Sequence, residues 1–144
     1  MFSVSEWEGN FGGHFSVFYG VLDPRAKRLS YASAGHPHAF RVPRSGPPER
    51  LEATAPPLGL AAMGTIQRRL VPWTPGADLL VLWTDGLVDA RNQAGEPYGE
   101  QRLLDSLAAH RTESPEAIVR AALADAESFG GEPIDDRTLL VMRI

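Results

Sequence analysis

The stretch Ala77–Gly86, with the sequence ADLLVLWTDG, constrains the fold of this chain more than any other. From Leu79 to Thr84 it is an uninterrupted, mostly apolar run that ends at an acid followed by a glycine. A short run of residues that suit a pleated sheet is typical of a strand buried on both faces. The strand delivers Asp85 to the end of a rigid element, where a carboxylate suits either a helix N-cap or a metal ligand.

The composition is that of a single globular domain. The chain has 144 residues, of which 43% are hydrophobic and 22% charged, enough for a real hydrophobic core. A net charge of −4 without a basic stripe argues against nucleic acid as a partner. The absence of cysteine excludes a disulfide framework, a thiolate metal site and a thiol nucleophile. No apolar run approaches the roughly 20 residues of a membrane span, and no signal-peptide pattern is present, so we expect a cytoplasmic protein without membrane contact.

Strand patterns dominate the first half of the chain. A turn at Asp23-Pro24 joins the first two strands into a β-hairpin. The predicted strands are Phe15–Leu22, Leu29–Ala34, Ala39–Val42, a short Leu51–Ala53, Thr65–Val71, the central run that ends at Thr84, and Thr138–Ile144.

Helix patterns follow in the second half. Leu87–Arg91 suits a helical turn, and Glu100–His110 places apolar residues on one helical face. Ser114-Pro115-Glu116 is a strong helix start, with an N-cap serine, a proline in the first turn and a favourable acid, and this helix is expected to end near Phe129. Strands first and helices later indicate an α+β fold with mainly antiparallel sheets.

Three acids flank core-type strands and are candidates for one site. Asp85 ends the central strand, and Asp135 and Asp136 precede the last one. If these strands are antiparallel neighbours, the three carboxylates converge at one rim of the sheet, and a cation must then offset their repulsion. Oxygen ligands suit Mg²⁺ or Mn²⁺, which activate water and clamp a phosphoryl group. The alternative is that Asp85 caps a helix while the acid pair lies solvated in a loop.

Four stretches in order resemble the metal-dependent protein phosphatase (PPM) family, in the bacterial branch named after stage II sporulation protein E (SpoIIE). A lone TDG would be weak support, but the ordered series is specific and covers the chain from Phe15 onward. The stretches are FSVFYGVLDP with LSYASAGHPHA, PPLGL, LLVLWTDGLVDARNQAGEPYGEQRL and DDRTLLVMR.

The resemblance implies an αββα sandwich and metal-dependent hydrolysis of phosphoserine or phosphothreonine on a protein. Asp85 and Asp135 match metal ligands of a binuclear Mg²⁺ or Mn²⁺ site, with Asp136 as an accessory acid. His36 lies where related eukaryotic enzymes carry an acid beside the metals. Two roles stay open for it, orientation of water or phosphate, and a hydrogen-bonded structural histidine. We expect no site role for His38.

Other expectations follow from the residues around these motifs. We expect Asp89 and Arg91 to form local salt bridges or caps, His14 to be structural, and Trp73 and Trp83 to lie in the core or on a sheet face.

The resemblance also identifies family motifs that have no match in this sequence. Residues 1–14 are expected to be a lead-in, and residues 15–144 a C-terminal portion of the phosphatase domain, because the family's earlier acidic motifs have no match here. Metal would then bind weakly. We expect the missing segment to leave an apolar face that is exposed or covered by self-association or a partner.

Two functions therefore stay open. One is a phosphatase acting on a phosphorylated regulatory protein that resembles an anti-sigma-factor antagonist. The other is a catalytically deficient remnant or interaction module on the same scaffold. A haloacid dehalogenase-type hydrolase is excluded because Trp83 and Leu87 occupy positions that its Asp-x-Asp-Gly-Thr motif requires.

Overall fold

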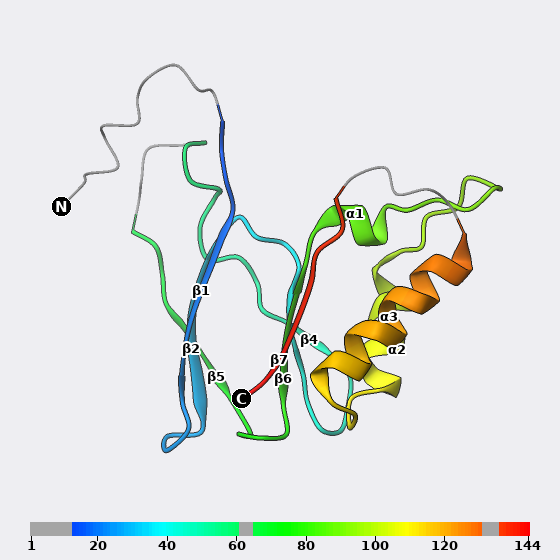
Figure 1. Cartoon of the computed structure of the whole chain (residues 1–144). Helices are drawn as coiled ribbons and strands as arrows, with labels where there is room; N and C mark the ends of the chain where they lie inside the picture. Colours follow the sequence, from blue (N-terminus) through cyan, green and yellow to red (C-terminus); the bar gives the residue numbers. More distant parts are fainter. Residues whose placement is uncertain (1–12, 61–64, 131–135) are drawn as a thin grey trace.

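The computed structural model describes residues 13–60, 65–130 and 136–144, which form two packed antiparallel sheets with helices on one side (Figure 1). This arrangement confirms the predicted α+β class. In chain order the elements are β1 (Val17–Asp23), β2 (Arg28–Ala34), β3 (Ala39–Val42), β4 (Glu49–Arg50), β5 (Arg69–Pro72), β6 (Leu79–Trp83), α1 (Asp85–Val88), α2 (Glu100–Ala109), α3 (Pro115–Phe129) and β7 (Leu139–Arg143).

The first sheet has three strands in the order β1-β2-β5, and the predicted hairpin supplies β1 at one edge and β2 in the centre. Asp23 shapes the hairpin turn, since one of its carboxylate oxygens accepts hydrogen bonds from the backbone N–H groups of Arg25 and Ala26, at 3.1 and 2.9 Å. β5 pairs with β2 only from Tyr31 opposite Arg69 to Arg28 opposite Pro72. The longer strand predicted at Thr65–Val71 is therefore wrong at its start.

The second sheet has four strands in the order β4-β3-β6-β7, so β6 lies between two neighbours. Every residue of β6 except Leu82 is buried, as its unbroken apolar run predicts. β7 is antiparallel to β6 and begins opposite its end, with Leu139 paired to Trp83. The strand predicted at Leu51–Ala53 is wrong. β4 ends at Arg50, and Leu51 donates a single backbone hydrogen bond to Ala39 at 2.8 Å.

Two apolar layers hold the sandwich together. One lies between the sheets and includes Leu29, Tyr31 and Leu80. The other lies between the four-stranded sheet and helices α2 and α3, which cover one of its faces (Figure 1). Full burial of a large apolar side chain stabilises a fold by about 1.5–3 kcal/mol. The predicted core positions of Trp73 and Trp83 are confirmed by exposures of 2% and 1%.

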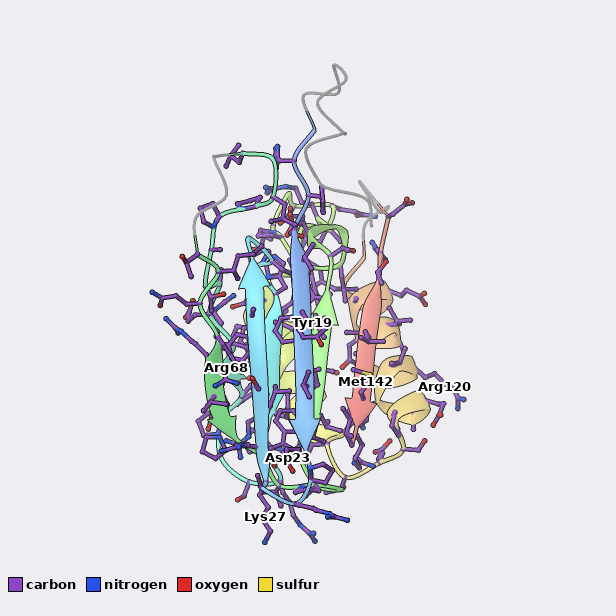
Figure 2. The ribbon with its side chains drawn as sticks, turned by 90° about the vertical axis from the view of Figure 1, so that its left-hand side faces the viewer. Tyr19, Asp23, Lys27, Arg68, Arg120 and Met142 are labelled. Carbon is purple, nitrogen blue, oxygen red and sulfur yellow. The ribbon has the colours of Figure 1, made fainter. Side chains whose placement is uncertain are left out.

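The outer face of the three-stranded sheet has no helix over it among the described residues. Figure 2 looks onto this face and shows Tyr19 of β1 pointing outward. Tyr19, Val21 and Leu70 are 66%, 50% and 51% exposed. The exposed apolar face expected from the sequence is therefore present in this structure.

The helices form as their sequence signals predict. The Ser114 hydroxyl accepts a hydrogen bond from the Ala117 N–H at 3.3 Å, Pro115 lies in the first turn, and the chain leaves α3 at Gly130 with a φ of 88°. In the described part of the chain, no helix has both the length and the apolar character needed to cross a membrane.

Candidate functional site

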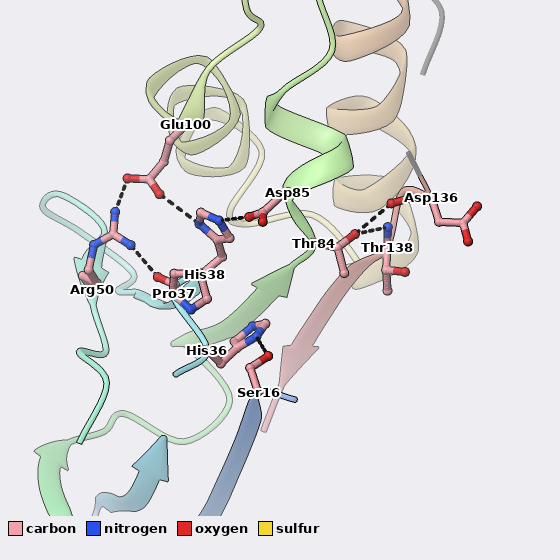
Figure 3. A network of polar contacts seen from close by, with 10 residues as sticks. All are labelled: Ser16, His36, Pro37, His38, Arg50, Thr84, Asp85, Glu100, Asp136 and Thr138. Carbon is pink, nitrogen blue, oxygen red and sulfur yellow. Dashed lines mark hydrogen bonds and ion pairs between the residues drawn. The ribbon is translucent and has the colours of Figure 1, made fainter. Parts of the chain in front are cut away.

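The site is built where β6 ends and β7 begins. The Thr84 N–H donates to the Thr138 carbonyl at 3.1 Å, and the Thr138 N–H donates to the Thr84 hydroxyl at 3.0 Å. That hydroxyl in turn donates to the backbone carbonyl of Asp136 at 3.1 Å (Figure 3). The two strand ends, remote in sequence, are thus fastened side by side. This juxtaposition is the one that the sequence analysis requires for a shared site.

Asp85 is the first residue of α1, and its carboxylate is 68% exposed. The N-cap of this helix is Thr84, and no side chain caps it. The interpretation of Asp85 as the helix N-cap is therefore wrong. Because β6 is buried and paired on both sides, the backbone that carries the Asp85 carboxylate is held rigidly at the sheet rim.

Of the two candidate acids that precede β7, Asp135 and Asp136, the structure describes Asp136 alone. Asp135 lies outside the described residues, so its predicted position stays a prediction. Asp136 is described, and Figure 3 shows its carboxylate pointing away from that of Asp85.

His38 is the residue that contacts Asp85. Its Nε2 lies 2.5 Å from an oxygen of Asp85, and its Nδ1 lies 3.3 Å from an oxygen of Glu100. The imidazole stacks on Trp83, with ring centroids 5.3 Å apart. Both ring nitrogens of His38 therefore contact a carboxylate oxygen, one from α1 and one from α2. His38 follows β2 and precedes β3, and it ties the rim of the sheet to the start of α2.

The guanidinium of Arg50 completes this group of side chains. Arg50 pairs with the other oxygen of Glu100 and donates to the Pro37 carbonyl. Its guanidinium lies 4.5 Å from the centre of the Phe40 ring. Glu100 is the first residue of α2, where a negative charge is favourable. A continuous network thus runs from Arg50 through Glu100 and His38 to Asp85 (Figure 3).

Sequence reasoning gave His38, Glu100 and Arg50 no role here. The contacts that join them span 47 to 62 residues of sequence, so no local pattern reveals them. Two weak sequence features point to these residues. His38 stands two residues beyond the Gly35-His36 motif, and Glu100 opens a predicted helix.

His36 lies beside Ser16, which directly precedes β1 of the three-stranded sheet. Its Nδ1 lies 3.4 Å from the Ser16 hydroxyl, while its Nε2 is buried without a hydrogen-bond partner among the described residues. Burial lowers the pKa of His36, and the neighbouring His38 lowers it further. A neutral imidazole with one unsatisfied nitrogen is compatible with both roles proposed for it, so both stay predictions.

The minor sequence expectations have mixed outcomes. Asp89 is the C-cap residue of α1 through its backbone N–H, and Arg91 donates to the Gly95 carbonyl at 2.8 Å. Both are local structural contacts, as expected. His14 is exposed in the described structure.

The donor chemistry at this rim fits a divalent cation only in part. Asp85 offers an exposed carboxylate, which is the ligand type that Mg²⁺ and Mn²⁺ prefer. However, the described residues contain no group of three or more carboxylate, imidazole or thiolate side chains that could hold an ion. Asp85 can therefore serve as one ligand, but the described part of the chain does not complete a coordination sphere.

Comparison with known proteins agrees with the fold and the strand-end motifs. The family model described as stage II sporulation protein E (SpoIIE) matches residues 5–144. Protein IcfG from Synechocystis sp. is 31% identical over 142 residues, which cover 96% of this chain and 22% of that protein. Phosphoserine phosphatase RsbP from Bacillus subtilis is 35% identical over 74 residues, which cover 51% of this chain and 18% of that protein.

A solved structure of similar fold is the SiaA-PP2C domain of Pseudomonas aeruginosa. It matches with a TM-score of 0.73 at 24% identity, and the match covers 90% of this chain and 51% of that one. This chain thus spans about half of the SiaA domain and about a fifth of each curated relative. Because the family model spans nearly the whole chain and the fold agrees, the chain belongs to the SpoIIE branch of the metal-dependent, PP2C-type protein phosphatases.

Proposed function

We propose that residues 15–144 form a C-terminal portion of a metal-dependent serine/threonine protein phosphatase domain, with residues 1–14 as a lead-in. The observation that carries the proposal is the exposed Asp85 carboxylate, which is held at the rim where β6 and β7 are fastened together. Family membership supports the reaction class. The position of Asp85 supports a role for this end of the sheet in the reaction.

The residues at the rim have distinct proposed roles. Asp85 supplies an oxygen ligand, and Asp135 and Asp136 contribute further acidic groups. His38 fixes the orientation of the Asp85 side chain through its bond to one carboxylate oxygen, which leaves the other oxygen for an ion. Bound Mg²⁺ or Mn²⁺ would supply Lewis acidity toward water and the phosphoryl group. A partner that orients a ligating carboxylate or imidazole typically changes metal affinity by about 10–100-fold when it is removed.

The proposed substrate is a phosphoserine or phosphothreonine on a cytoplasmic regulatory protein, similar to an anti-sigma-factor antagonist. RsbP, one of the relatives, is a phosphoserine phosphatase. The negative net charge of this chain gives no reason to expect nucleic acid as an alternative partner.

The test is hydrolysis of a phosphoserine peptide by the chain in the presence of Mn²⁺. Asp85→Ala is expected to abolish release of phosphate. Asp89→Asn is the matched control, because this exposed acid lies in the same turn and its side chain has no contact with the network. Equal activity of Asp85→Ala and the unmodified chain would remove the basis for the proposal.

A second candidate function is a catalytically deficient remnant or interaction module on this scaffold. The observation in its favour is that the described residues do not form a cluster of three potential ligands. Calorimetric titration with Mn²⁺ separates the two functions. Tight binding of two ions rejects the remnant, whereas absent binding together with absent hydrolysis favours it.

A further inference from the structure

A pocket lined by three arginines lies at the other end of the β6–β7 pair from Asp85. Its volume is about 160 Å³. Ala77 precedes β6 and Arg143 ends β7, so the residues that line the pocket lie at the opposite end of the β6–β7 pair from Asp85. Figure 1 shows these two ends of the strands. Asp85 is eight positions after Ala77, and at about 3.3 Å per residue this corresponds to at most about 26 Å. The lining residues are Arg44, Gly76, Ala77, Arg111, Thr112 and Arg143.

Two of these arginines are fixed by backbone carbonyls. Arg111 donates from Nε to Ala108 at 2.7 Å, and from Nη1 to Pro43 at 2.8 Å and to Gly46 at 2.7 Å. Arg143 donates from Nη2 to the Arg111 carbonyl at 2.6 Å. Nη2 of Arg111 and Nε and Nη1 of Arg143 are left without a described partner. The charges are therefore held in place while part of their donor capacity is unused.

Arg44 provides the third charge. Its backbone N–H lies 3.4 Å from an oxygen of Asp78, but its side chain is exposed and has no hydrogen bond or ion pair among the described residues. The guanidinium at this edge of the pocket is thus free to turn toward a ligand.

The nearby acids already have other side-chain partners. Asp78 is buried and pairs with Arg41 at 2.8 Å. Glu113, in the same turn as Arg111, pairs with His110 at 2.8 Å. Among the described residues, including the terminal carboxylate of Ile144, no acid forms an ion pair with any of the three arginines that line the pocket. The terminal residue Ile144 lies nearby, where its carbonyl oxygen accepts a hydrogen bond from the Gly76 N–H at 2.6 Å, but the three guanidinium groups keep their positive charge without an ion pair to a described acid.

We propose that this pocket binds a phosphate group. Guanidinium groups match the planar, multidentate hydrogen bonding of phosphate oxygens, and a doubly charged anion offsets the repulsion among three cations. A volume of about 160 Å³ holds on the order of five water molecules, which is room for one small tetrahedral anion. The group belongs either to a free anion or to a phosphorylated side chain of a protein. This site is separate from the proposed reaction at Asp85.

The test is titration of the isotopically labelled chain with inorganic phosphate, at constant ionic strength and without divalent metal ions. The backbone amide signals of Gly76, Ala77 and Thr112 are expected to shift saturably. Arg44→Gln is expected to weaken binding about tenfold or more, because it removes a charge-assisted hydrogen-bond donor to the anion. Arg44→Gln keeps every described side-chain contact, so it tests binding without disturbing the fold.

Controls separate this site from general charge effects and from the acidic rim. Arg120→Gln removes an exposed arginine on α3, on the helix side of Figure 2, and is expected to bind phosphate as the unmodified chain does. Asp85→Asn is also expected to retain phosphate binding, so the outcome is independent of the proposed phosphatase function. Tighter binding of a phosphoserine peptide than of inorganic phosphate assigns the pocket to a phosphorylated protein, and equal affinities assign it to a free anion. Absence of a saturable shift, or equal affinities of Arg44→Gln and Arg120→Gln, would overturn the proposal.

Discussion

The two sheets share an apolar interior but differ on their outer faces. Helices α2 and α3 cover the four-stranded sheet, where Leu107 and Ile118 are fully buried. The outer face of the three-stranded sheet instead presents Tyr19 and Leu70 to solvent. Both faces carry large apolar side chains, so the strand pattern alone does not tell which one is covered. The difference indicates that burial free energy is concentrated on the helix side of the molecule.

Leu107→Ala tests the covered side and is expected to have the largest effect. Leu107 on α2 has no solvent exposure and packs in the layer between the helices and the sheet. Removing a buried leucine side chain typically costs about 2–5 kcal/mol of unfolding free energy, through lost burial and the cavity left behind. Urea unfolding followed by circular dichroism measures this cost. A loss below about 1 kcal/mol would show that this layer is not the main source of stability.

The four-stranded sheet and the helices that cover it are also the part of the fold that could be predicted best from the sequence. The Ser114-Pro115 start of α3 and the unbroken apolar run of β6 are strong local signals, and both elements form as expected. The start of β5 and the position of β4 could not be predicted, because each depends on where a neighbouring strand offers hydrogen bonds.

Gly35→Ala tests the three-stranded sheet, whose outer face has no helix over it among the described residues. Gly35 follows directly after β2. Gly35 has a φ of 68°, and a β carbon there would lie 2.3 Å from the Pro57 side chain. A left-handed conformation at a residue other than glycine costs about 1–3 kcal/mol, and the clash adds to it. Gly46→Ala is the matched control, since Gly46 has a φ of 90° with open space around it. Equal losses of unfolding free energy in the two variants would show that Pro57 yields without cost.

The site shows the same division between local and long-range information. Delivery of Asp85 to the rim could be predicted, because it follows from the strand that precedes it. The His38–Asp85 and His38–Glu100 contacts could not, since they depend on how β3, α1 and α2 come together in three dimensions. The site role of Asp136 stays a prediction, and its carboxylate points away from that of Asp85 in this structure (Figure 3).

His36, which lies beside Ser16 at the start of β1, allows a smaller test that measures how the unfolding free energy depends on pH. Its folded pKa is lowered by burial, so the unfolded chain binds a proton more readily as the pH falls below about 6.5. Stability from this residue is therefore present above that pH and is lost as the pH falls through it. His36→Gln is expected to give a flatter dependence of unfolding free energy on pH between 7 and 5. Because the side chain is only half-buried, solvent screening keeps the effect modest. Parallel pH profiles for the two proteins would contradict this account.

Leu70→Ala tests the uncovered face directly and is expected to have the smallest effect. Leu70 is 51% exposed, and the residue paired with it on the neighbouring strand β2 is Ser30. The substitution therefore removes little buried apolar contact. Surface substitutions of this kind usually change the unfolding free energy by no more than about 0.5 kcal/mol. The urea midpoint, measured at a low and at a tenfold higher protein concentration, supplies the decisive comparison with Leu107→Ala. A cost as large as that of Leu107→Ala would show that Leu70 is buried in solution. A cost that grows with concentration would identify a second copy of the chain as the cover, because association then contributes to stability by mass action.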